Sequence, residues 1–307
     1  MKFNALLLIP LAAMMLGGCN QENPYFDDRE GKIEDYNGYY QFSGTYLDAD
    51  DNEKPLSVSI NYEDRGQALA IKLHNLMIAT HTTYAKYGEF KETATYKKSS
   101  YNPKTKKIVY FYTGKEVSSY NATREHVWPC ANSGGLWQRD SEAGTDIGED
   151  YQGGGSDLYH VMPCSSNVNT MRGNSKYTEF GEGVKFYKGT DGGKYQLKGD
   201  AYSFSNKSEP AKEYRGDIAR IICYLYVHYN GIGVTNKYCG KTDALTFNNV
   251  VIACAGEAVK ETIARWNYED PVDDVELYRN EQVSKYQGNR NPFIDHPEFV
   301  WKMLGVE

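Results

Sequence analysis

Two six-residue phrases of this chain are nearly the same: EHVWPC at Glu125–Cys130 and YHVMPC at Tyr159–Cys164, with histidines 34 residues apart. Each histidine is followed by β-forming residues and then by proline, which suits the end of a strand. A glycine-rich segment, DYQGGGSD, lies between the phrases. Two short strands joined through such a loop can pair antiparallel, so we predict a β-hairpin here.

The residues after the second phrase favour a helix. The sequence CSSNVNTMRGN offers Ser165 and Ser166 as N-caps, and Asn169 and Arg172 are three residues apart, so they share one helix face. We therefore expect a strand, a loop, a strand and a helix in that order, with His126 facing Asn169 and Arg172. This arrangement outlines a small metal-dependent hydrolytic site.

The rest of the chain shows helical patterns more often than strand patterns. Apolar residues at helical spacing and proline or aspartate at first-turn positions carry these predictions. Helices are expected at 67–83, from about Pro210, around 257–266 and from Asp270-Pro271, with a strand at 106–114. Beyond the two phrases the sequence shows no repeat and no low-complexity tract. We predict one α+β domain, mostly helical, over residues 37–307.

The N-terminus is not expected to belong to this fold. Residues 1–18 contain one basic residue, a short apolar run and two glycines before Cys19, which is the layout of a secretory signal. The run is too short for a membrane-spanning helix, which needs about 20 apolar residues. Cys19 resembles the cysteine of a bacterial lipobox, which implies cleavage before it and a lipid on its sulfur. An ordinary signal peptide with a coincidental cysteine is the alternative.

Residues 19–36 then form a polar, acidic tether between the lipid and the domain. The lipid would hold the chain on a membrane of the bacterial cell envelope. The absence of aspartate directly after Cys19 favours the outer membrane, and which face the domain occupies stays open.

The charge of the chain is acidic, at −7 overall and −8 once the positive charge of Lys2 is removed. Broad attraction to polyanions is therefore excluded, and a nucleic-acid site must be a local basic patch. The segment YKKSSYNPKTKK at 96–107 holds five lysines and offers such a patch; a solvated loop is the alternative.

The cysteines do not indicate a metal site. Five remain after Cys19, an odd number with no C-x-x-C pair, so a structural zinc site is poorly supported and at least one thiol stays free or pairs between chains. In an antiparallel hairpin the ends of the two phrases lie far apart. A disulfide between Cys130 and Cys164 is therefore not expected.

Four ordered blocks resemble one known family. REHVWP at 124–129, DLYHVMP at 157–163, NVNTMRGN at 167–174 and QGNRNPFIDHPE at 287–298 are similar to the bacterial endonuclease I family of nucleases with a His-Me finger, or ββα-metal, core. The resemblance runs from about Gln67 to the C-terminus. It implies a secreted or periplasmic, divalent-metal-dependent endonuclease that uses water as nucleophile and leaves 5′-phosphate ends.

The resemblance also implies roles for single residues. Glu125 and Asn169 match the family's metal ligands, and His126 matches the general base that activates water. Mg²⁺ prefers oxygen ligands and keeps several waters, so these two ligands suffice; Mn²⁺ and Ca²⁺ are further candidates. A neutral imidazole suits a base at neutral pH. From its chemistry, Arg172 is expected to neutralise charge developing on the phosphate.

One physical objection concerns Glu125 and His126. Adjacent strand residues point to opposite faces of a sheet. Both can serve one site only if the strand ends or distorts there, or if the metal sits at the strand edge. Regular pairing through both residues would count against Glu125 as a ligand. Taken singly, each site residue also has an ordinary structural explanation.

Other residues are candidates for support or substrate contact. The family often has histidine where this chain has Tyr159, so a supporting histidine there is in doubt, whereas His160 is expected to hold loop or backbone. The candidate substrate contacts are Arg124, Arg139, Asn174 and Arg290, of which Arg290 suits a role in holding the C-terminal segment equally well. No pattern indicates readout of base edges. We expect recognition of the phosphate backbone of DNA, with RNA left open, and little sequence preference.

The alternative function is a surface lipoprotein that keeps this fold and binds nucleic acid or a partner without cutting it. Loss of Glu125, His126 or Asn169 would favour it, and all three are present. Another hydrolase class has little support, because the sequence holds no G-x-S-x-G, P-loop or H-E-x-x-H motif. The oligomeric state is open.

Overall fold

The structure is a computed structural model that describes residues 40–91, 94–119, 121–132, 137, 148–179, 186–188, 196–198, 207–239 and 259–306. It mixes helices with small sheets, which confirms the α+β class. The helices are α1 (Gly66–Thr80), α2 (Ala94–Ser99), α3 (Ser166–Arg172), α5 (Arg215–His228), α6 (Val259–Glu269), α7 (Asp274–Gln287), α8 (Pro292–Asp295) and α9 (Glu298–Leu304). Short 3-10 turns are η3 (Tyr87–Lys91), η4 (Cys130–Asn132), η5 (Gly154–Ser156) and η6 (Lys212–Tyr214).

The strands in the described ranges form two-stranded sheets. The strands are β1 (Gln41–Leu47), β2 (Glu53–Ser59), β3 (Ile108–Tyr110), β4 (Lys115–Val117), β5 (Thr123–His126), β6 (Val161–Cys164), β7 (Lys176–Tyr177), β8 (Phe186–Lys188), β9 (Gln196–Lys198) and β10 (Lys207–Ser208). β7 and β10 pair in parallel, and the pairs β1–β2, β3–β4, β5–β6 and β8–β9 are antiparallel.

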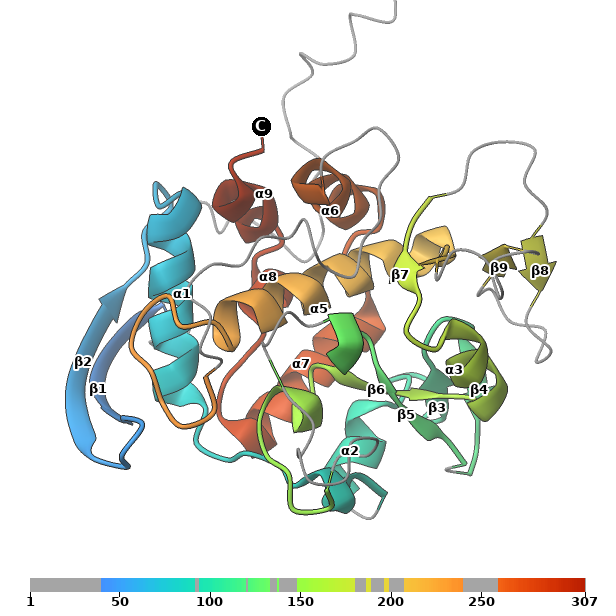
Figure 1. The fold of residues 1–307 in the computed structure, drawn as a ribbon, viewed down its shortest axis with the longest axis horizontal. Coiled ribbons are helices and arrows are strands. Elements are labelled where there is room, and N and C mark those ends of the chain that lie inside the picture. The colour runs from blue at the N-terminus through green and yellow to red at the C-terminus, as the bar shows by residue number, and fades with distance from the viewer. Residues whose placement is uncertain are drawn as a thin grey trace, which may run out of the picture.

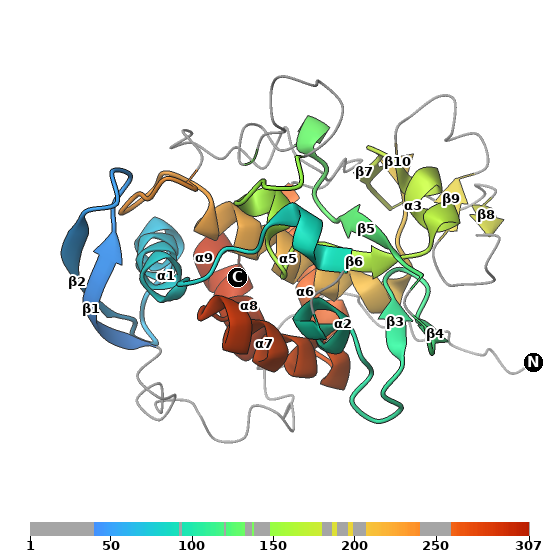
Figure 2. The same ribbon diagram turned by 90° about the horizontal axis from the view of Figure 1, so that it is seen from below.

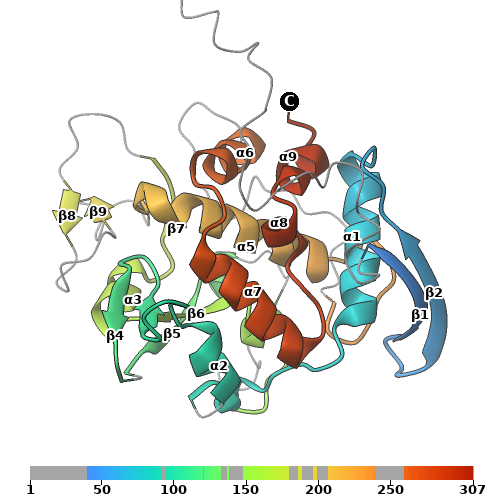
Figure 3. The same cartoon turned by 180° about the vertical axis from the view of Figure 1, so that it is seen from behind.

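Helix α5 forms the centre of the molecule. Twelve of its fourteen residues are buried, because it packs against α1, α6 and α8 on different sides (Figures 1 and 3). The β1–β2 ribbon covers α1 at one end of the molecule, and the β5–β6 pair with α3 lies at the other end (Figure 2). One hydrophobic cluster joins these parts, from Tyr40 to Leu304. None of the described helices is long and apolar enough to cross a membrane.

Most of the expected elements are present with shifted ends. The helices expected at 67–83 and 257–266 are confirmed as α1 and α6. The strand expected at 106–114 is wrong beyond β3, because Tyr112 and Gly114 have φ values of 70° and 63° and turn the chain before β4. The helix expected from Pro210 begins instead at Arg215, after the turn η6.

The helix expected from Asp270-Pro271 begins at Asp274. Its N-cap is Asp273, whose carboxylate accepts hydrogen bonds from the backbone N–H groups of Val275 and Glu276 at 2.8 and 2.9 Å. Asp270 serves a different helix, because its carboxylate accepts a hydrogen bond from the N–H of Gly216 at the start of α5. The sequence thus offers two aspartates as the N-cap of α7, and Asp273, the second of them, is the residue that caps it.

Candidate active site

The hairpin and helix expected from the two phrases are present as β5, β6 and α3. β5 pairs antiparallel with β6 in the register Thr123–Cys164 to His126–Val161. The N-cap of α3 is Ser165, whose hydroxyl accepts a hydrogen bond from the N–H of Val168. Cys130 and Cys164 are both free thiols, in agreement with the absence of a disulfide between them.

The side chain of His126 is half-buried and held by one backbone carbonyl. Its Nε2 lies 2.7 Å from the carbonyl oxygen of Gly155 in η5. Since a carbonyl oxygen can only accept, Nε2 carries the proton and Nδ1 carries the lone pair of the neutral ring. The ring stacks with Trp137 and Tyr87, at centroid distances of 4.8 and 5.6 Å. The imidazole is therefore oriented and set in the tautomer that offers Nδ1 as a base.

His160, the histidine of the second phrase, bridges two stretches of backbone. Its Nδ1 lies 2.6 Å from the carbonyl oxygen of Gly154, and its Nε2 accepts a hydrogen bond from the N–H of Trp128 at 3.0 Å. Burial strongly lowers the pKa of this imidazole, so it is neutral. His160 thereby fastens the strand that carries His126 to the glycine turn that His126 contacts.

Glu125 points away from His126, to the buried face of β5. Pairing is regular through both residues, with Glu125 opposite Met162 and His126 opposite Val161, and β5 ends at His126. The Glu125 carboxylate is 2 % exposed; it accepts a hydrogen bond from the Tyr112 hydroxyl at 2.7 Å. Burial raises its pKa to about 7, against the opposing effects of Arg172 and Tyr112. The carboxylate and the imidazole thus occupy opposite faces of one strand, and this regular pairing counts against Glu125 as a ligand beside His126. The end of β5 at His126 is the remaining way in which both residues can serve one site.

Helix α3 lies along the edge of β5 that β6 does not cover. Pro163, opposite Arg124, has no N–H, and its carbonyl accepts from Phe111, so the Arg124 carbonyl points away from β6. The Asn169 side-chain nitrogen donates to this carbonyl and to the Thr123 hydroxyl, both at 3.1 Å. The amide nitrogen is thereby used, and its oxygen accepts no hydrogen bond from the described residues. Asn169 can present that oxygen to a cation.

Arg172 lies in the core instead of at the surface. Its guanidinium donates to the carbonyl oxygens of His126 and Val127, at 3.3 and 2.7 Å, and lies 3.6 Å from the Glu125 carboxylate. The side chain is 1 % exposed and stacks over the Tyr177 ring. In this position Arg172 holds the end of β5.

The structure describes three of the four candidate substrate residues, Arg124, Asn174 and Arg290. The Arg124 guanidinium lies 3.7 Å above the Tyr87 ring and donates to the Tyr87 carbonyl, on the face of β5 that carries His126. Asn174 is exposed just after α3. Arg139 and Cys19 lie outside the described residues.

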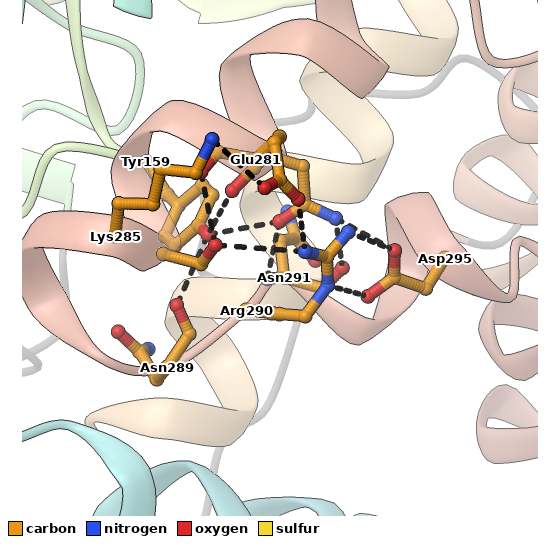
Figure 4. Close-up of polar contacts among 9 residues, drawn as sticks. Tyr159, Glu281, Lys285, Asn289, Arg290, Asn291 and Asp295 are labelled. Atoms are coloured by element: carbon orange, nitrogen blue, oxygen red, sulfur yellow. Dashed lines mark hydrogen bonds and ion pairs between the residues drawn. The ribbon is translucent and has the colours of Figure 1, made fainter. Parts of the chain in front are cut away.

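Arg290 holds the C-terminal segment together. Its guanidinium binds both oxygens of the buried Asp295 at 2.7 Å, and Glu281 at 3.0 Å (Figure 4). The Tyr159 hydroxyl lies in the same network, 2.8 Å from the side-chain oxygen of Asn280. Tyr159 is therefore a contact to the C-terminal segment and not to His126.

The lysine-rich segment is largely exposed. Lys98, Lys104, Lys106 and Lys107 all reach solvent, but Lys104 forms an ion pair with Asp274 and Lys106 lies over the Tyr278 ring. Two of its four exposed charges are thus engaged with helix α7.

A second group of metal-type ligands was not singled out in the sequence. His81, Asp157 and His228 place ligand atoms within 4.8 Å of one another. However, the Asp157 carboxylate already accepts four hydrogen bonds, which use the lone pairs of both oxygens, and the two histidines bond each other at 2.7 Å. Hydrogen bonding therefore accounts for most of this group, although the buried His228 Nδ1 has no hydrogen-bond partner among the described residues. Its members are far apart in sequence, so no local motif marks them.

Comparison with known proteins places these observations in a family. A sequence model described as Endonuclease I matches residues 55–298. An extracellular ribonuclease of Bacillus subtilis is 36% identical over 189 residues, 61% of this chain and 54% of the relative. An extracellular ribonuclease of Bacillus amyloliquefaciens is 32% identical over 253 residues, 76% of this chain and 73% of the relative. An extracellular deoxyribonuclease of Aeromonas hydrophila is 24% identical over 174 residues, 56% and 64% of the two chains. The matched region thus spans about half of the first relative's length.

Proposed function

Because this chain belongs to the endonuclease I family, we propose that it is a divalent-metal-dependent endonuclease that hydrolyses phosphodiester bonds of nucleic acid with little sequence preference and leaves 5′-phosphate ends. DNA is the first candidate substrate. RNA is the second, since the relatives at 36% and 32% identity are named ribonucleases, whereas the deoxyribonuclease is 24% identical. The ββα unit would then be a His-Me finger.

The observation that carries this proposal is the hydrogen bond from His126 Nε2–H to the Gly155 carbonyl at 2.7 Å. In this tautomer Nδ1 carries the lone pair, which would take a proton from water as the water attacks phosphorus. Trp137 and Tyr87 flank the ring and limit its rotation. The base is thus held before substrate arrives, and little reorganisation is needed during the reaction.

The donor set beside β5 fits a hard divalent cation. The Asn169 amide oxygen and the Glu125 carboxylate would hold it, since both are oxygen ligands and the second Glu125 oxygen accepts no hydrogen bond from the described residues. Such an ion, when bound, would supply polarisation of the phosphate and stabilisation of the leaving oxygen. Asn169 binds the edge of β5 that β6 does not cover. Side chains from both faces of the strand can contact a phosphate that lies at this edge. Mg²⁺ is the first candidate, followed by Mn²⁺ and Ca²⁺.

Arg172 and Arg124 have different roles in this proposal. Arg172 positions the end of β5 through the His126 and Val127 carbonyls. Arg124 shares a strand face with His126 and is half-buried, so it is the guanidinium placed to contact a substrate phosphate. Asn174, Arg139 and Arg290 are weaker candidates for substrate contact.

We also propose that the chain is lipid-anchored through Cys19 to the cell envelope. The relatives named above as extracellular are consistent with export. The test is metabolic labelling with a radioactive fatty acid, comparing the natural chain with Cys19→Ser. Label in both chains, or in neither, would contradict the anchor.

Plasmid cleavage tests the enzymatic proposal. The chain from residue 19 onward, carrying Cys19→Ser, is assayed with Mg²⁺, with EDTA and as His126→Ala, beside His81→Gln as a buried-histidine control. Nicking that needs Mg²⁺, persists in His81→Gln and vanishes in His126→Ala is the expected result. Activity that survives His126→Ala would place the base elsewhere. A folded protein inactive with several metals on DNA and RNA would favour a binding lipoprotein.

A further inference from the structure

The carbonyl that orients His126 belongs to a turn that is anchored two residues later, at Asp157. The Asp157 carboxylate is 2 % exposed. Its Oδ2 accepts hydrogen bonds from the hydroxyls of Tyr224 and Tyr229 at 2.7 and 2.6 Å. Its Oδ1 accepts from the N–H of Tyr159 at 2.7 Å and from the side chain of Gln287 at 3.3 Å. One side chain thus ties this turn to α5 and to the end of α7.

The C-terminal segment holds the same turn by its backbone. The Gln287 side-chain oxygen accepts the N–H of Leu158 at 2.7 Å, and the Arg279 guanidinium binds the carbonyl oxygens of Leu158 and Val161. Beside them the Tyr159 hydroxyl meets the Asn289 carbonyl at 3.1 Å (Figure 4). The residues that follow η5 are therefore fixed along their whole length.

The turn also makes local contacts: the Gly155 N–H donates to the Tyr151 hydroxyl at 3.5 Å, and Ser156 donates to the Gly153 carbonyl. Within this turn, the carbonyl oxygens of Gly154 and Gly155 form hydrogen bonds with the rings of His160 and His126. A shift at Asp157 would therefore move the acceptor on which the His126 tautomer depends. The Asp157 backbone carbonyl also receives the N–H groups of His160 and Val161, which links the turn to β6.

We propose that Asp157 is a positioning residue for catalysis, which keeps the Gly155 carbonyl in place and thereby selects the Nε2–H tautomer of His126. The inference rests on the proposed function of His126 as the base. Asp157 itself does not contact the substrate. Asp157 acts on His126 indirectly. It fixes the backbone of the turn, and the Gly155 carbonyl of that turn accepts the hydrogen bond from His126.

A carboxylate is needed here because all four partners are donors. An asparagine at this position offers one oxygen, which can accept from at most two of them, and its NH₂ group would face the others donor to donor. The turn must then shift to relieve the conflict. Asp157→Asn therefore changes hydrogen bonding with almost no change in size.

The test compares Asp157→Asn with Glu276→Gln in the chain from residue 19 onward carrying Cys19→Ser. Glu276 is also buried and pairs with Arg220, but its described contacts do not reach residues 153–161. Two quantities are measured: kcat and KM on DNA, and the ring tautomers of ¹⁵N-labelled histidine by NMR, with the His126 signal assigned through His126→Ala. We expect at least a tenfold lower kcat, KM within twofold, and a mixed His126 tautomer in Asp157→Asn only.

Two further outcomes keep the inference testable. If Asp157→Asn does not fold, Tyr229→Phe removes one of the four donors and should give a smaller change of the same kind. If the wild-type chain shows no nuclease activity, the tautomer measurement still decides whether Asp157 controls His126. A pure Nε2–H tautomer in folded Asp157→Asn, or equal loss of kcat in Glu276→Gln, would overturn the inference.

Discussion

His126 and His160, the histidines of the two repeated phrases, face adjacent carbonyl oxygens, those of Gly155 and Gly154, at 2.7 and 2.6 Å. His126 is the last residue of β5 and His160 directly precedes β6, so the two paired strands bring both rings to one glycine turn. His126 is half-buried, and His160 is fully buried with hydrogen-bond partners for both of its ring nitrogens. The repeat in the sequence thus corresponds to two ring contacts with one turn.

Replacing Gly155 by alanine should damage this contact. An added Cβ would lie 2.7 Å from the six-membered ring of Trp137, which is closer than real contacts allow, and 3.1 Å from the Tyr151 ring, which is tight. Since Trp137 stacks on His126, we expect the turn or the tryptophan to shift and kcat to fall at least tenfold. Steady-state cleavage kinetics measure this. An unchanged kcat in a folded Gly155→Ala chain would show that His126 does not need this carbonyl.

We expect the loss of Arg172 to lower the stability of the fold more directly than it changes the chemistry. Arg172→Met removes the donors to the His126 and Val127 carbonyls and leaves the Glu125 carboxylate without its cation. Breaking a buried pair in this way lowers the free energy of unfolding by about 3–5 kcal/mol. Adding Glu125→Gln should recover part of the loss, because a neutral amide needs no cation. Urea denaturation of the single and double variants measures both effects; a double variant less stable than Arg172→Met would contradict the pairing.

The N-cap of α3 links stability to metal binding. Ser165→Ala removes the acceptor for the Val168 N–H and should cost about 1 kcal/mol of unfolding free energy. Because α3 carries Asn169, a loosened first turn should also raise the Mg²⁺ concentration needed for half-maximal cleavage. Ser165→Asp is the matched variant, since aspartate caps equally well and should keep both properties. Equal Mg²⁺ requirements in all three chains would show that the first turn of α3 does not affect metal binding.

Acid should destabilise the fold through its buried histidines. Burial lowers the pKa of His81 from 6.5 to about 3, against the opposing effect of the Thr83 carbonyl. Between these pH values the unfolded chain binds a proton that the folded chain does not, so stability is retained above pH 6.5 and lost as the pH falls. The loss is about 1.4 kcal/mol per pH unit for one such group.

His81→Gln removes this titration and should make the unfolding free energy less dependent on pH between about 6 and 4. Urea denaturation at several pH values compares it with the natural chain. The natural chain should lose about 1.4 kcal/mol more per pH unit than the variant. Parallel curves for the two chains would show that His81 is not held neutral by the fold.

The sequence predicted what is decided locally. The strand β6 and the start of α3 at Ser165 were predicted, because each signal acts over a few residues. The strand β5 ends at His126, before the Val127 and Trp128 on which its prediction rested. The start of α7 was wrong because two aspartates three residues apart are equally good caps in the sequence. The face occupied by Arg172 was not predictable either, since an exposed and a buried arginine look alike until the carbonyls they contact are placed.

Asp157 shows the limit most clearly. Its partners Tyr224, Tyr229 and Gln287 are 67, 72 and 130 residues away along the chain. No spacing rule connects them, and a tyrosine or glutamine in a helix is ordinary when taken alone. Only the packing of α5 and α7 brings these three distant donors to one carboxylate, where they join the local N–H of Tyr159.

The position of α3 along β5 has a consequence for behaviour in concentrated solution. An uncovered strand edge presents backbone donors and acceptors on which another chain can build a sheet. In this protein Asn169 and Arg172 bind the Arg124 and His126 carbonyls along that edge. Any change that detaches α3 therefore uncovers a template for intermolecular β-pairing, so the side chains that shape the site are also the ones that protect the chain from aggregation.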